Sequence, residues 1–138
     1  MDYIKEKAIH YKFAFKIFGD DIDIIAICNK LNFSSYEIRR KGEISTGYVE
    51  IPHDMVIFRS KYFDFNLGVE EYIAQLYSRK EAIKEIKKLP GVNMYLCCYI
   101  CSEMGQIGFT ITSKVTNWLS ELELDLNIDI LSYGMVET

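Results

Sequence analysis

The sequence has few residues of three types: two prolines, two histidines and one tryptophan in 138 residues. The longest apolar run, residues 94–101, is eight residues, whereas a membrane-spanning helix needs about 20. The N-terminus alternates in charge and lacks the apolar stretch of a signal peptide. These absences predict a cytoplasmic protein with no membrane partner.

The sequence also has no excess of basic residues. The 16 basic side chains are outnumbered by 20 acidic ones, for a net charge of −4. A general nucleic-acid binder needs a basic surface, so the charge excludes nucleic acid as an expected partner. Hydrophobic residues make up 49% and aromatic residues 14%, which is typical of a chain with a well-filled core. The length suits one domain spanning residues 1–138.

Four cysteines are present, and Cys98 and Cys101 have the spacing of half a zinc site or of a redox pair. A zinc site needs a second ligand pair, and a redox pair needs a helix N-terminus. The surrounding run instead predicts a strand, on which residues three apart face opposite sides. We therefore expect Cys28, Cys97, Cys98 and Cys101 to be buried, unreactive thiols.

Alternating and helical hydrophobic patterns predict ten elements in the order βαββααββαβ. Asp20–Asp23 open the first helix, Ser78–Glu81 resemble a capping box between two helices, and a turn near Met104–Gln106 separates two strands. The order indicates an α+β fold, a largely antiparallel sheet with helices on one face. The expected strands cover residues 9–18, 35–41, 55–60, 92–101, 107–112 and 123–130, and the expected helices begin near residues 20, 69, 78 and 113.

The sequence lacks the motifs of common enzymes: no nucleophile elbow, phosphate-binding loop, HExxH helix or dinucleotide-binding glycine pattern. His10 lies on an alternating strand and His53 in a loop, with no local catalytic partner. Asp20, Asp21 and Asp23 could hold a hard cation, but helix capping explains them without one. We therefore predict no catalytic residue, no metal site and no cofactor.

The sheet face without helices offers a more specific hypothesis. If Phe13 and Phe15 face the helices, the opposite face carries lysines, tyrosines and acids, a composition common in protein-binding surfaces. The alternatives are cross-strand ion pairs of Lys12 and Lys16 with Asp125 and Asp129, or a homodimer that buries the tyrosines. The predicted partner-binding residues are Lys12, Lys16, Tyr95, Tyr99, Glu123, Asp125 and Asp129.

Four short motifs follow one another along the chain between Tyr11 and Tyr133. They are Phe18-Gly19-Asp20-Asp21-Ile22-Asp23, Lys41-Gly42-Glu43, Gly105-Gln106-Ile107-Gly108-Phe109 and Leu126-Asn127-Ile128-Asp129-Ile130. In this order they resemble the motifs of a bacterial family, domain of unknown function 4279. The resemblance supplies no catalytic residue, but it implies a small protein encoded in a toxin–immunity neighbourhood.

Together these observations predict a non-enzymatic immunity protein that binds and neutralises a cognate toxin. A nuclease would be a suitable target, because an acidic inhibitor is steered into a basic cleft. One alternative is a small-molecule-binding or enzymatic domain with a pocket between helices and sheet and Asp20 and Asp21 at its rim. The other is a homo-oligomeric structural module.

Overall fold

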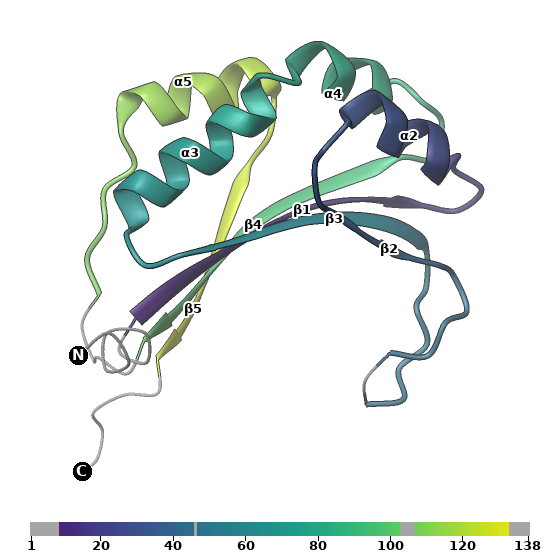
Figure 1. Ribbon diagram of the computed structural model, residues 1–138, viewed down its shortest axis with the longest axis horizontal. Helices are drawn as coiled ribbons and strands as arrows, with labels where there is room; N and C mark the ends of the chain where they lie inside the picture. Colours follow the sequence, from purple (N-terminus) through teal and green to yellow (C-terminus); the bar gives the residue numbers. More distant parts are fainter. Residues whose placement is uncertain (1–8, 46, 103–106, 133–138) are drawn as a thin grey trace.

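The chain forms two layers, a sheet and a set of helices that all lie on one face of it (Figure 1). This is a computed structural model, and it describes residues 9–45, 47–102 and 107–132. The α+β fold predicted from the sequence is confirmed. The strands are β1 (Ile9–Gly19), β2 (Glu37–Arg39), β3 (Asp54–Tyr62), β4 (Asn93–Ser102) and β5 (Leu126–Ser132); the helices are α2 (Ile24–Leu31), α3 (Phe65–Tyr77), α4 (Lys80–Lys87) and α5 (Ser113–Leu122).

The strands are ordered β2-β3-β1-β4-β5, with β1 at the centre. Neighbouring strands are antiparallel except β4 and β5, which are parallel. A parallel pair needs a crossover connection, and α5 supplies it. The sheet is therefore largely antiparallel, as expected, with one parallel edge.

The core lies between the two layers and is built from strand alternation and helix periodicity. On β1, Tyr11, Phe13, Phe15 and Ile17 are buried against the helices, while Lys12 and Lys16 face the other way. The helices add apolar positions at helical spacing, such as Ile24, Ile27, Cys28 and Leu31 on α2. The space between helices and sheet is filled with side chains of one continuous cluster.

Helix capping accounts for one of the three aspartates near the start of α2. The Asp23 side chain accepts a hydrogen bond from the Ala26 amide at 3.1 Å and caps the helix. The break between α3 and α4 is also present, but Ser78 ends α3 rather than opening α4. Its hydroxyl donates to the Gln75 carbonyl, and α4 begins after Arg79 with no side-chain cap. The predicted capping box is therefore wrong, although the helix boundary is right.

The predicted strand at residues 107–112 is not a strand. The turn expected at Met104–Gln106 lies outside the described residues, and residues 107–112 have no regular structure. Because β1 and β5 pair with β4 on its two sides, no edge of β4 is free for a hairpin partner. The alternate apolar residues of this segment nevertheless face the protein interior, since Ile107, Phe109 and Ile111 pack against the core.

All four cysteines are buried. Burial raises the pKa of Cys98 to about 12, so its thiol stays protonated at neutral pH. Cys98 faces Phe13 and the helices, whereas Cys97 and Cys101 face the other side of the sheet, as strand geometry requires. Within the described part of the chain, no helix is long and apolar enough to cross a membrane.

Candidate functional site

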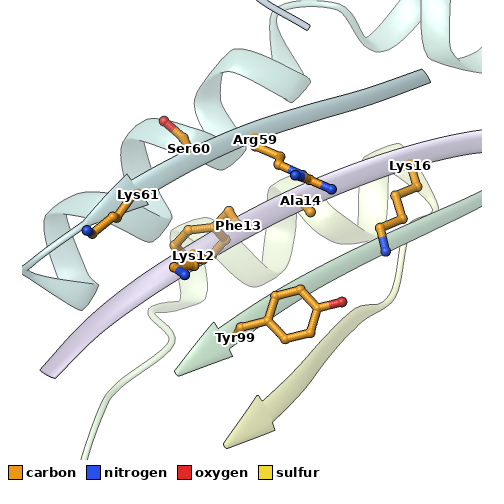
Figure 2. A pocket seen from close by; sticks show the side chains of 8 residues that line it. All are labelled: Lys12, Phe13, Ala14, Lys16, Arg59, Ser60, Lys61 and Tyr99. Atoms are coloured by element: carbon orange, nitrogen blue, oxygen red, sulfur yellow. The ribbon is translucent and has the colours of Figure 1, made fainter. Parts of the chain in front are cut away.

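The sheet face opposite the helices carries a shallow cavity of about 630 Å³. We call this side of the sheet the open face. Figure 2 shows the side chains around the cavity: two lysines from β1, an arginine and a lysine from β3, and a tyrosine from β4. Its lining residues are Lys12, Phe13, Ala14, Lys16, Arg59, Ser60, Lys61 and Tyr99.

Strand register brings these cations together. Lys12 on β1 lies directly opposite Lys61 on β3, and Ala14 lies opposite Arg59. Like charges placed opposite each other across two strands destabilise the pair. Among the described residues, neither lysine forms an ion pair. The cavity is thus strongly positive in a protein whose net charge is −4.

Of the four cations, Lys61 lies with its ammonium 5.3 Å from the centre of the Phe63 ring, and Lys16 and Arg59 are held by neighbours on the open face. The Lys16 ammonium lies 6.0 Å from the centre of the Tyr95 ring, within range of a cation–π contact. Arg59 Nη1 lies 3.1 Å from a Glu37 carboxylate oxygen, and Glu37 also pairs with Arg39. These contacts fix the direction of both cations, and Glu37 offsets part of the positive charge on the β2 side.

The floor of the open face is apolar. Ala14, Ile57 and Cys97 are buried there, with Met55 and Tyr99 packed against them. A hydrogen bond with the Cys97 thiol, together with burial, raises the pKa of Tyr99 to about 12. The Tyr99 hydroxyl therefore stays protonated, and its one O–H donor is directed to the Cys97 sulfur.

The residues predicted for partner binding are distributed over three places. Lys12, Lys16 and Tyr99 line the cavity. Asp129 lies beside Tyr99 on the edge strand β5. A second hollow of about 420 Å³, near the start of β4, is lined by Tyr95, Glu123 and Asp125 among others. Glu123 and Asp125 are not on a strand as predicted, because β5 begins at Leu126. Glu123 instead ends α5 in a left-handed conformation with φ of 56°.

The predicted ion pairs between β1 and β5 are wrong. β4 separates the two strands, so Lys12 and Lys16 face the tyrosine row of β4 instead of Asp125 and Asp129. The open face therefore changes in character across the sheet, from cations on β3 and β1, through tyrosines on β4, to Asp129 on β5.

Arg59 and Lys61 were missed by the sequence analysis. They are two residues apart on β3 and so share a face, which is a detectable signal. The preceding residues, Met55–Phe58, are all apolar and hide the alternation. The pairing of β3 with β1, which places these cations beside Lys12, also has no local signature in the sequence.

The cluster around Asp20 has a structural role. Asp20 lies 3.0 Å from His53 Nδ1 and 3.5 Å from the Lys41 ammonium, and the bond with His53 lowers the pKa of Asp20. These contacts tie the end of β1 to the β2–β3 connection. Among the described residues, no group of three or more histidine, cysteine or acidic side chains could hold a metal ion. Asp20 and Asp21 also do not line the open-face cavity.

The Lys12–Lys61 pair gives a prediction about stability. Replacing Lys61 by glutamate turns a like-charge pair into an opposite-charge pair across the strands, but it also removes the contact of Lys61 with the Phe63 ring. The free energy of unfolding should therefore rise by at most about 0.5 kcal/mol. Urea unfolding of the wild type and the variant measures the change, and the gain should shrink at high salt. A clear loss of stability would contradict the opposed placement of the two lysines.

The fold and site define an open-faced α+β domain, with helices on one face of a sheet and a cationic cavity on the other. The chain belongs to the family of the domain of unknown function DUF4279, whose model matches residues 9–133. No curated protein and no solved structure matches the chain significantly.

Proposed function

We propose that this protein is a non-enzymatic binding domain of the immunity type, which places its open face on an acidic surface of a cognate toxin in the bacterial cytoplasm. One observation carries the proposal: four cations surround an apolar floor on a sheet face that no described element covers. Burying that floor against a partner supplies affinity, and the cations supply orientation and speed of association.

The charges of the open face favour an acidic partner surface. Overall acidity alone suggested a basic nuclease cleft as the target, but Lys12, Lys16 and Lys61 would repel such a cleft. An acidic surface would instead relieve the repulsion between Lys12 and Lys61. The Tyr99 ring would add aromatic contact area to the interface.

The same charges disfavour a homodimer through this cavity. A two-fold interface places the same patch of both copies against itself, so two sets of four cations would meet. Like-charge contacts of this kind cost several kcal/mol. An acidic surface of a different protein therefore complements the charges of the open face better than a second copy of this chain does.

The test uses the protein encoded by the adjacent gene as the candidate toxin. Wild-type protein should bind it and protect cells that express it. Lys61→Glu should weaken binding at least tenfold, mainly by slowing association, because a cation in an acidic interface becomes an acid. Lys88→Glu is the matched control, since it makes the same charge change at the exposed C-terminal end of α4, on the helical side.

Two results would count against the proposal. If the wild type neither binds the neighbouring product nor protects cells, the immunity role is wrong. If Lys61→Glu and Lys88→Glu weaken binding equally, the partner does not use the open face. Slower association for Lys61→Glu alone, with a strong dependence on ionic strength, would support it.

A further inference from the structure

The connection between β2 and β3 forms a protruding arm, residues 42–51. Figure 1 shows it extending away from the helical layer, past the end of the sheet. Backbone hydrogen bonds hold its two sides together: the Ile51 amide donates to the Glu43 carbonyl at 2.7 Å, and the Ser45 amide to the Val49 carbonyl at 2.7 Å. The described residues of the arm, 42–45 and 47–51, are therefore paired as a hairpin.

The arm exposes large apolar side chains near its tip. Tyr48 is 93% exposed, Ile44 is 63% exposed and Val49 is 62% exposed. None of them belongs to or packs against either apolar cluster of the described residues. Burial of these side chains does not contribute to folding of the isolated chain.

Tyr48 is also in an unfavourable backbone conformation. Its φ is 65°, in the left-handed region that glycine and asparagine tolerate far better than an aromatic residue. No hydrogen bond or ring contact of its side chain compensates for this cost in the described part of the chain. A tyrosine here is worse for stability than glycine, so its value must come from something outside the chain.

We infer that the arm is the second contact of the protein partner and that Tyr48 is its anchor, seated in an apolar pocket beside the partner's acidic surface. The inference rests on the proposed function, because it assigns the arm and the open face to the same partner. Tyrosines are enriched among residues that dominate binding energy, and a preordered hairpin loses little entropy when it docks. Ile44 and Val49 would cover the rim of the pocket.

Tyr48→Gly and Tyr48→Asn test the inference, because they should preserve or raise the stability of the protein while they weaken its binding to the partner. Because both residues suit a positive φ, the melting temperature should stay unchanged or rise by up to about 4 °C. Binding to the adjacent-gene product, measured by calorimetry, should weaken at least tenfold because the anchor is lost. The control is Leu67→Ala, which removes an exposed apolar side chain of α3 on the helical layer and should leave affinity unchanged.

Each outcome of these measurements supports or overturns the anchor role of Tyr48. A lower melting temperature for both Tyr48 variants would mean that Tyr48 stabilises the fold, and the anchor role would be overturned. Unchanged stability with unchanged affinity would overturn it too, while leaving the open face intact as the binding surface if Lys61→Glu still weakens binding. Failure of the wild type itself to bind would instead remove the proposed function, and the anchor role with it.

Discussion

Replacing Tyr72 by alanine should lower the free energy of unfolding by about 3–5 kcal/mol, the usual range for removing a large buried aromatic ring. Tyr72 is fully buried on α3. Its ring stacks on Phe58 at 4.9 Å and on Phe13 at 5.0 Å between ring centres. Phe58 in turn stacks on Phe33 at 4.1 Å. The residue thus joins α3 to β1 and β3, and its loss would leave a cavity between the layers.

Tyr72→Phe separates the ring from its hydroxyl. The hydroxyl donates a hydrogen bond to the Phe58 carbonyl at 2.6 Å, so its removal should cost about 1 kcal/mol. Burial also raises the pKa of Tyr72, which keeps the hydroxyl protonated as a donor. Equilibrium urea unfolding measures both variants. A loss below about 1 kcal/mol for Tyr72→Ala would mean that the core refills the space, contrary to the close packing described.

Gly19→Ala should be the second strongly destabilising substitution. It should lower the free energy of unfolding by about 3 kcal/mol, the upper end of the usual range for overpacking a core. Gly19 ends β1, and a Cβ there would lie 2.1 Å from the Gly91 carbonyl oxygen and 3.0 Å from Ile22 Cγ2. The closest obstacle is backbone, which cannot rotate away as a side chain can. The end of β1 or the turn before β4 would have to move.

Gly108→Ala is the matched control, because a Cβ at Gly108 meets nothing within 4 Å. Its stability should stay within about 0.5 kcal/mol of the wild type. Thermal or urea unfolding compares the two variants under one set of conditions. Equal effects at both positions would show that Gly19 is not held against Gly91.

The parts of the fold that follow from local physics were predictable. On β1, one face is apolar throughout and the other is mixed, so Phe13 and Lys12 could be assigned to opposite faces before their neighbours were known. On β4, both faces are apolar or aromatic, a pattern typical of the internal position that β4 has in the sheet. Helix periodicity likewise identified the buried side of α2 and α5.

The parts that depend on strand order were not predictable. Alternation at residues 107–112 is the same for a strand and for an irregular segment packed on the core, and only the occupied edges of β4 decide between them. The cavity likewise needs β3 beside β1, which brings Arg59 and Lys61 next to Lys12. Half of the cationic cluster was therefore visible in the sequence, and the other half depended on long-range pairing.

The central position of β1 constrains how the chain can fold during synthesis. Residues 9–19 leave the ribosome before their two partners, residues 54–62 and 93–102. Pairings so distant in sequence form slowly, because the entropy cost of closing long loops is met before any stabilising contact forms. Until residue 102 has emerged, the nascent polypeptide presents the aromatic row of its first strand without its final cover. We therefore expect residues 9–19 to be a preferred binding site for chaperones that shield apolar stretches of nascent chains.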